Sequence, residues 1–200
     1  MTPLSTGLAL TWRPTPAVRA MLIGAALAGV VWLRAVLVGG SIDALGVGLV
    51  FGAGLLAVSV TAGWRPARGG AIRAVAMGLA GATALVGLSW VARLQGPALP
   101  LAAPAPFWAW AGATTIVAAA EEIVLRGAFF DACEVAWGVP VSLGVTSVAF
   151  ALMHVPTYGV PAVPLDLGVG LVLGGLRVLS GGPGAPAVAH VAADLAAWFL

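Results

Sequence analysis

The chain has very little charge for its length. Of its 200 residues only 8% are charged, whereas 61% are hydrophobic and the mean hydropathy is +1.08. Soluble domains average about 25% charged residues, so a soluble fold is excluded. There is no lysine, and the nine basic residues are all arginine and form no cluster. We therefore expect no nucleic-acid partner.

Motifs of several soluble enzyme classes are also missing. Without a Gly-Lys-Ser/Thr loop an ATPase is excluded, and the zinc-protease motif His-Glu-x-x-His is absent. Ser147 lies near the histidines in sequence, but no Gly-x-Ser-x-Gly turn is present. Cys133 is the single cysteine, so an intramolecular disulfide is impossible. We interpret Cys133 as a small buried apolar side chain.

The chain consists mainly of long apolar runs. Continuous runs of about 20 residues predict membrane-spanning helices rather than barrel strands, which alternate apolar and polar residues. The predicted fold is all-α, a polytopic transmembrane bundle of about six to eight helices. Arginine, proline and glycine mark the boundaries of seven predicted spans. The fourth span begins at Phe107 and carries an acidic motif near its end. The others are Ala20–Val38, Ala44–Gly63, Ala74–Ala92, Val139–Val155, Leu165–Leu179 and a short last one from Ala187 to Leu200.

The chain is predicted to form a single membrane domain with two parts. Residues 1–106 are expected to supply about three N-terminal spans and a proline-rich linker, Gly96 to Pro106. The first run is longer than the core of a signal peptide and has no clear cleavage site after it, so we expect it to be retained. Residues 128–138 alternate aromatic and acidic side chains at helical spacing, which predicts a short interfacial or re-entrant helix.

Six ionisable residues lie inside apolar runs in the last eighty residues. A charge at bilayer depth costs several kcal/mol unless it pairs or lines a wet cavity, so such residues point to a functional site. One or two carboxylates and two histidines near one depth are suited to activating water. The six residues are Glu121, Glu122 and Arg126, then His154, then His190 and Asp194.

The acidic motif divides into a pair and a free acid. Glu122 and Arg126 are four residues apart, so they share a helix face in the favourable order for an ion pair. Glu121 points about 100° away and has no such partner on its own helix. It is free to face a cavity and to act as a general base. The alternative is a salt bridge at a helix end with one interfacial glutamate.

The two histidines also leave alternatives open. His190 and Asp194 are four residues apart, so the carboxylate would orient the imidazole, accept its N–H, or join a metal or water site. Alternatively, the two form a polar pair that holds helices together. His154 is either part of the same site or an interfacial histidine before a proline turn.

Arginines in short loops predict the orientation, because such loops stay in the cytoplasm. The N-terminus is expected inside, in a bacterial cytoplasmic membrane. The acidic motif and His190 should then lie toward the cytoplasmic ends of their spans. A simple topology would put His154 toward the opposite end of its own span, unless that span starts deep, after a re-entrant segment, or its helix is broken. The arginines that support this orientation precede the first span (Arg13, Arg19) or stand between the second and third (Arg65, Arg68, Arg73).

In order and approximate spacing, three motifs resemble those of the CAAX prenyl endopeptidase and bacteriocin-processing family (CPBP, or Abi) of intramembrane proteases. The motifs are Glu121-Glu122-x-x-x-Arg126, Phe150-x-x-x-His154 and His190-x-x-x-Asp194. The resemblance covers about residues 107–200 and implies that this part is the catalytic core. It also implies a water-accessible cavity that opens toward the cytoplasm.

The resemblance implies a role for each motif residue. Glu121 would activate water for peptide-bond hydrolysis, with Glu122 and Arg126 in supporting roles. His154 would hold the water or a metal, and His190 with Asp194 would complete the site. The substrates would be membrane-associated or prenylated-type proteins or peptides, and membrane lipids would be the other partners. No organic cofactor is expected.

Three further points remain open at this stage. The first is a divalent metal such as zinc, for which Glu121, His154, His190 and Asp194 would be ligands. The second is Asp194, since the family more often has asparagine there; its charge would favour a bound cation or a protonated histidine. The third is a catalytically inactive membrane scaffold or bacteriocin-immunity protein of the same fold that binds a partner.

Overall fold

The computed structural model describes residues 14–38, 40, 42–66, 70–95 and 106–199. Among these residues every regular element is a helix and there is no strand, so the all-α prediction is confirmed. The elements are α1 (Pro16–Val38), α2 (Ala44–Thr61), α3 (Ala71–Gln95), α4 (Phe107–Glu122), the π-helix η1 (Ile123–Phe129), α5 (Phe130–Trp137), α6 (Val139–Tyr158), the 3-10 helix η2 (Val160–Ala162), α7 (Val163–Ser180) and α8 (Gly184–Ala197).

Five segments are long and apolar enough to cross a membrane: α1, α2, α3 as far as Val91, α6, and η2 with α7. The protein is therefore an integral membrane protein. Helix α8 has only 14 residues and is about 21 Å long, shorter than the ~30 Å hydrocarbon core, in agreement with the short last span that the sequence predicts. The predicted linker, except for Pro106, lies outside the described residues.

The predicted fourth helix carries the acidic motif at its end, since α4 ends at Glu122, but the helical chain does not stop there. The chain stays helical from Phe107 to Trp137, because α4 continues directly into η1 and η1 into α5. Glu121 thus lies at the middle of a 31-residue helical stretch and not at its end. The short helix predicted at residues 128–138 exists as α5, but it continues from η1 without a break. Gly138, with φ of 82°, ends α5 before α6 begins.

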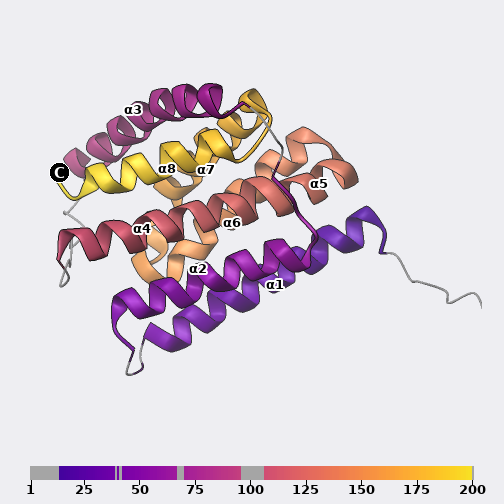
Figure 1. Ribbon diagram of the computed structural model, residues 1–200, viewed down its shortest axis with the longest axis horizontal. Coiled ribbons are helices and arrows are strands. Elements are labelled where there is room, and N and C mark those ends of the chain that lie inside the picture. The colour runs from indigo at the N-terminus through magenta and orange to yellow at the C-terminus, as the bar shows by residue number, and fades with distance from the viewer. Residues whose placement is uncertain (1–13, 39, 41, 67–69, 96–105, 200) are drawn as a thin grey trace, which may run out of the picture.

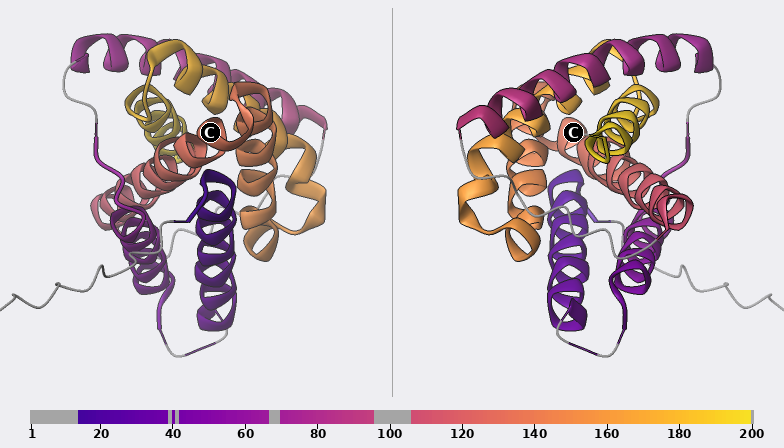
Figure 2. Two further views of the ribbon diagram at one scale, coloured as in Figure 1. Left: turned by 90° about the vertical axis from the view of Figure 1, so that its right-hand side faces the viewer. Right: turned by 90° about the vertical axis from the view of Figure 1, so that its left-hand side faces the viewer.

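Helix α4 lies between α2 and α8 (Figure 1), and its last turn carries the acidic motif into the buried part of the bundle. Helix α4 packs against α2 on one side and α8 on the other, and α2 pairs with α1. Helix α6 packs against α5 and α7. Helix α3 crosses over α8 and α7 at the outside of the bundle, as the end views in Figure 2 show.

Small residues let the helices approach closely. A Cβ atom on Gly170 of α7 would lie 3.0 Å from the Cα of Ser147 in α6. A Cβ on Gly78 of α3 would lie 2.8 Å from the carbonyl oxygen of Ala185 in α8. Contacts of small residues are a main source of helix association in lipid, where apolar burial gives little driving force.

Candidate active site

Glu122 and Arg126 form a fully buried ion pair at the centre of the bundle. Arg126 Nη1 donates to Glu122 Oε1 at 2.9 Å, and its Nη2 donates to the carbonyl of Gly170 in α7 at 3.0 Å. The guanidinium lies 4.8 Å from the centroid of the Phe150 ring in α6. Arg126 therefore ties η1 to both α6 and α7.

The ring of His190 is oriented by Glu122 rather than by Asp194. Its Nδ1 lies 3.0 Å from Glu122 Oε1. A carboxylate in an ion pair can only accept, so Nδ1 carries the hydrogen and donates it. In the neutral ring the lone pair is then on Nε2. Nε2 lies 3.9 Å from Glu121 Oε2 and 3.6 Å from Asp194 Oδ2.

The ring of His154 is oriented in the same sense by the backbone. Its Nδ1 lies 2.9 Å from the carbonyl oxygen of Phe150, one turn earlier in α6. A carbonyl oxygen only accepts, so Nδ1 donates and the lone pair of the neutral ring is on Nε2. This Nε2 lies 4.0 Å from Glu121 Oε2.

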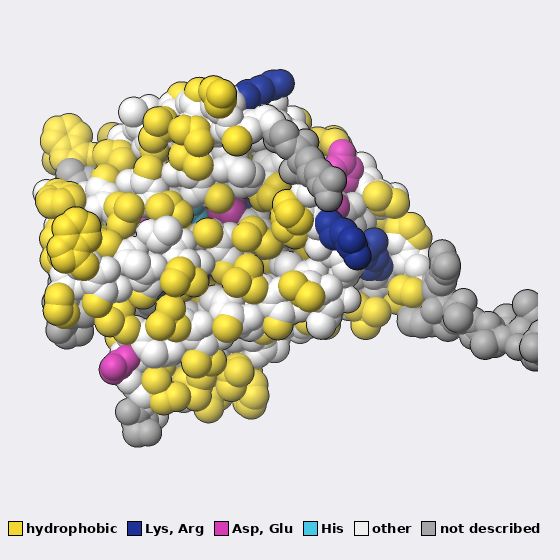
Figure 3. All heavy atoms as spheres, in the orientation of Figure 1, with side chains coloured by type: hydrophobic (Ala, Val, Ile, Leu, Met, Phe, Trp, Pro, Cys, Tyr) yellow, Lys and Arg dark blue, Asp and Glu magenta, His cyan; other side chains and the backbone are white. Residues whose placement is uncertain are grey.

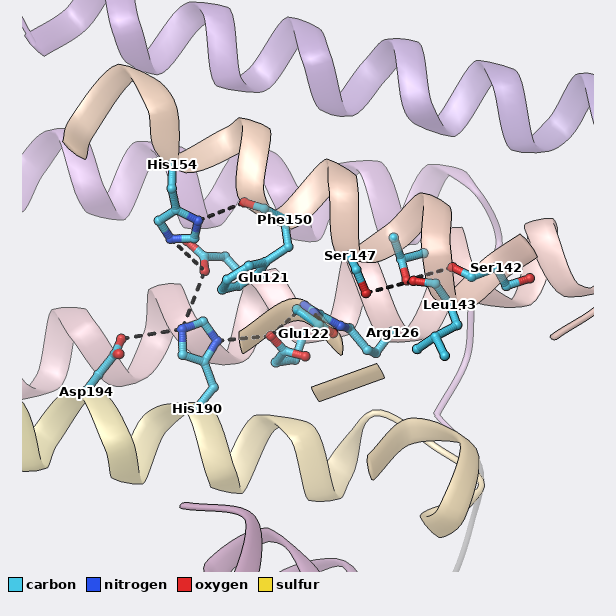
Figure 4. Close-up of polar contacts among 12 residues, drawn as sticks. Glu121, Glu122, Arg126, Ser142, Leu143, Ser147, Phe150, His154, His190 and Asp194 are labelled. Carbon is cyan, nitrogen blue, oxygen red and sulfur yellow. Dashed lines mark hydrogen bonds and ion pairs between the residues drawn. The ribbon is translucent and has the colours of Figure 1, made fainter. Parts of the chain in front are cut away.

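Glu121 lies between the two imidazoles, as Figure 4 shows. Its side chain is 3% exposed, and its Oε2 is the atom that faces both Nε2 atoms. Each separation is longer than a hydrogen bond and short enough for one bridging water. We call the four residues around this point the cavity cluster: Glu121, His154, His190 and Asp194.

A cavity of about 580 Å³ contains the cavity cluster. Asp166 and Arg34 also line it, and neither was assigned a role from the sequence. Asp166 Oδ2 is buried and has no hydrogen-bond partner among the described residues. The signal that could have found both residues is an ionisable side chain within an apolar span. In Figure 3 histidine and acidic atoms are visible near the middle of a mainly apolar face.

Two aromatic residues hold the imidazoles in place, and sequence reasoning gave neither a role of its own. The Phe150 ring lies 4.5 Å from the ring of His154 and 5.4 Å from that of His190, between centroids. Tyr158 stacks on His154 at 5.7 Å with an interplanar angle of 12°. The four-residue spacing of Phe150, His154 and Tyr158 along α6 could have indicated this stack.

The structure decides the depth of His154, which the sequence left open. His154 lies together with Glu121 and His190. Glu121 lies in the last turn of α4, about 21 Å along the helix from Phe107. It there reaches the depth of His154, which lies four residues before the end of α6.

A second set of ionic contacts lies beside the first but outside the cavity. Arg177 Nε donates to the backbone carbonyl of Arg126 at 2.8 Å, and its Nη2 donates to Asp131 at 2.7 Å. Trp64 Nε1 donates to the other oxygen of Asp131 at 3.2 Å. These contacts tie η1 and α5 to α7. We call Arg126, Arg177, Glu122 and Asp131 the arginine network.

Ser147 and Cys133 do not contribute to the site. Both are fully buried, and neither lines the cavity. The Ser147 hydroxyl donates to the carbonyl of Leu143 at 2.7 Å, within α6.

The donor types of the cavity cluster suit a zinc ion, but their spacing does not form a ligand set. Within the described part of the chain, no group of three or more His, Cys, Asp or Glu side chains is arranged to hold a metal ion. Two ligands at about 2.1 Å from a tetrahedral zinc would be roughly 3.4 Å apart, whereas Glu121 Oε2 lies 3.9 and 4.0 Å from the two Nε2 atoms. The metal site stays a prediction.

Residues 103–196 match the family described as type II CAAX prenyl endopeptidase Rce1-like. The match contains all three motifs and leaves α1, α2 and α3 outside it. No curated protein and no solved structure matches the chain.

Proposed function

The chain belongs, through residues 103–196, to the Rce1-like family of type II CAAX prenyl endopeptidases, and we propose that it is an intramembrane endopeptidase in which Glu121 activates water. The observation that carries this proposal is the position of Glu121 Oε2, which is 4.0 and 3.9 Å from the Nε2 atoms of His154 and His190. A water between these atoms would meet one proton acceptor and two fixed imidazoles.

In this proposal the imidazoles hold the water and Glu121 takes its proton. The Nε2 lone pairs of His154 and His190 accept hydrogen bonds from water or turn it toward the substrate. As Glu121 removes one proton, the water oxygen attacks the carbonyl carbon of the peptide bond, and the carbonyl oxygen becomes an oxyanion.

Glu121 then returns the proton to the amide nitrogen, the C–N bond breaks, and a carboxylic acid and an amine are released. If His190 enters the reaction already protonated, the water is held by His154 alone, and His190 instead donates from Nε2 to the oxyanion while Nδ1 stays bonded to Glu122. Asp194, 3.6 Å from that Nε2, would stabilise such a proton.

Supporting residues fix this geometry without meeting the substrate. Arg126 and Glu122 orient His190, and the Phe150 carbonyl orients His154. Pre-organised groups of this kind lower the barrier because they need not reorient during the reaction. The proposed substrates are membrane-associated or prenylated-type proteins, whose apolar parts the cavity wall would contact through Leu85, Val117 and Val169.

The other way of activating water would be a zinc ion, for which the cavity cluster has the donor types but not the spacing of a ligand set. If bound, it would lower the pKa of a bound water molecule. Dialysis against a chelator distinguishes the metal-free mechanism from the zinc-dependent one, because it abolishes activity only when a metal is required. The inactive scaffold or immunity protein is not favoured by the match to a protease family.

The test compares Glu121→Gln with Glu134→Gln in an expression host. Glu134 lies on α5, and its side chain is 40% exposed, so its substitution is a matched control. New protein termini in the host membranes are identified by mass spectrometry. We expect the wild type and Glu134→Gln to produce the same new termini and Glu121→Gln to produce none. Cleavage retained in Glu121→Gln would refute the proposal.

A further inference from the structure

We propose that a second pocket, at one end of the bundle, binds the phosphate group of an anionic membrane phospholipid. The pocket has a volume of about 310 Å³ and shares no lining residue with the cavity of the candidate active site. Its lining includes Arg19 of α1, Trp64 and Arg65 just after α2, and Asp131 and Val135 of α5. We call it the interfacial pocket. The proposal does not depend on the proposed function.

The interfacial pocket lies where two membrane-spanning helices end. Helix α1 begins at Pro16 and α2 ends at Thr61, and both are long and apolar enough to cross a membrane. Helix α5 packs against α1 and lies at the same end of the bundle as its start (Figure 1). The ends of spans lie at the level of the lipid headgroups, where tryptophan side chains such as Trp64 are enriched. A pocket at this level meets phospholipid phosphates.

Two arginines offer hydrogen-bond donors to this pocket. Arg19 Nη2 donates to the carbonyl oxygen of Ala62 at 2.7 Å, which holds the guanidinium in place while its other N–H groups can reach a ligand. Arg65 lines the same pocket and is exposed. Arginine atoms are visible at the surface of this end of the bundle in Figure 3. Two guanidinium groups at one pocket favour an anion, and they bind phosphate oxygens through paired hydrogen bonds.

The acidic residue in the pocket is already neutralised. Asp131 Oδ1 accepts from Arg177 at 2.7 Å, and its Oδ2 accepts from Trp64 Nε1 at 3.2 Å. Among the described residues the ion pair of Asp131 is with Arg177 and not with Arg19 or Arg65. Asp131 therefore does not compete with a ligand for the two arginines that line the pocket.

An apolar surface beside the arginines favours a lipid over a soluble anion. Val135 lines the pocket and is 73% exposed, so it offers a contact for the glycerol backbone and the first acyl carbons. A phosphatidylcholine headgroup carries a cation next to its phosphate, which the two arginines would repel. An anionic headgroup such as phosphatidylglycerol has no such cation, and basic pockets between membrane helices are suited to it.

A lipid in this pocket would stabilise the helical stretch that carries the active site. Trp64 lies against η1, since a Cβ atom on Gly127 would be 2.8 Å from its indole Cε2. Asp131 belongs to the arginine network, which ties η1 and α5 to α7. A phosphate that bridges Arg19 and Arg65 would hold α1 and the segment after α2 against α5. Because a ligand that binds the folded state stabilises it, the lipid should raise the melting temperature.

Native mass spectrometry of the purified protein in a neutral detergent measures the binding directly. The two probes are phosphatidylglycerol and phosphatidylcholine with the same acyl chains. We expect the dissociation constant of phosphatidylglycerol to be about tenfold lower than that of phosphatidylcholine. Equal dissociation constants would overturn the proposal, because the charge of the headgroup would then not select the lipid.

Arg19→Gln and Arg65→Gln test the pocket, and Arg73→Gln is the matched control. Arg73 is exposed in the first turn of α3 and donates from Nη2 to the carbonyl of Leu179 at 3.0 Å, much as Arg19 does in α1, but it does not line the pocket. We expect each pocket variant to weaken phosphatidylglycerol binding about tenfold and the control to change it less than about twofold. An equal loss in the control would overturn the site, since the effect would then come from the general charge of this end.

Melting curves separate a loss of binding from a loss of folding. In detergent without lipid we expect Arg65→Gln to melt at the wild-type temperature, because its exposed side chain has no ion-pair partner among the described residues. Added phosphatidylglycerol should raise the melting temperature of the wild type and not that of Arg65→Gln. Equal stabilisation of both by the lipid would refute the proposal.

Inorganic phosphate distinguishes a lipid site from a site for soluble anions. We expect inorganic phosphate at the concentration of the lipid to leave phosphatidylglycerol bound, because it lacks the apolar part that Val135 would contact. Displacement of the lipid at that concentration would overturn the assignment to a phospholipid. None of these measurements requires cleavage, so Glu121→Gln should bind the lipid like the wild type whatever the outcome for the proposed function.

Discussion

The arginine network and the cavity cluster contain similar residue types at different spacings. In the network, Arg126 meets Glu122 at 2.9 Å and Arg177 meets Asp131 at 2.7 Å. In the cluster, the contacts of Glu121 with the histidines are 3.9 and 4.0 Å long. Groups at hydrogen-bond distance satisfy one another and hold helices together. Groups about 4 Å apart around a cavity leave space for a reacting molecule.

His190 belongs to both sets, and its two nitrogens have different partners. Nδ1 is bonded to Glu122 of the network, while Nε2 faces Glu121 and Asp194. The network therefore determines which nitrogen faces the cavity. A metal- or water-binding histidine is usually oriented by such a partner on its other nitrogen.

The largest expected effects separate the two adjacent glutamates. Glu122→Gln leaves Arg126 buried without its ionic partner, so we expect a loss of about 3–5 kcal/mol in the free energy of unfolding. Glu121→Gln should leave that free energy unchanged and lower the cleavage rate about 10²–10⁴-fold, the usual contribution of a general base. The free energy of unfolding is measured in mixed detergent micelles, and the cleavage rate is measured with one substrate for both variants. If the two variants lost similar amounts of stability and of cleavage rate, the arginine network and the cavity cluster would not have separate roles.

Arg177→Gln tests the network away from the cavity. It removes the hydrogen bonds to the Arg126 carbonyl and to Asp131, so we expect a loss of about 1.5–3 kcal/mol. The Michaelis constant should stay within twofold, because Arg177 does not line the cavity. Arg73→Gln, which loses one hydrogen bond at an exposed position, is the control. A large change in substrate affinity with unchanged stability would contradict the structural role.

Gly170→Ala tests the close packing that positions Arg126. The new Cβ would lie 3.0 Å from the Ser147 backbone, so α6 and α7 must separate, at a cost of about 1–3 kcal/mol. Gly175→Ala in the same helix meets nothing within 4 Å and should be neutral. Thermal melting of the two variants in one detergent checks this. Equal melting temperatures would show that the helix contact is not tight.

Asp194→Asn is expected to have the smallest effect. Its side chain is 42% exposed and 3.6 Å from His190, and the ring keeps its bond to Glu122, so the cleavage rate should change less than about tenfold, or 1.4 kcal/mol. The measurement is the cleavage rate with a chelator and across a zinc titration. A variant that needs far more zinc than the wild type would identify Asp194 as a metal ligand and exclude metal-free water activation.

The predicted helices agree well with the structure, apart from the fourth. The runs 20–38, 44–63 and 139–155 correspond to α1, α2 and α6. Hydropathy could not show that the helix continues past Arg126, because η1 and α5 contain charges that the sequence places at an interface. Those acidic residues pair with an arginine of another helix, as the contact of Asp131 with Arg177 shows.

The sequence by itself determined the class of the protein and singled out the candidate residues of its site. Lipid cannot satisfy backbone hydrogen bonds, so long apolar runs must become helices, and charges within such runs are rare enough to mark a site. Only the tertiary structure decided that Glu122 orients His190 and that His154 lies beside Glu121. These features depend on contacts between helices far apart in the chain, and no local pattern of residues contains them.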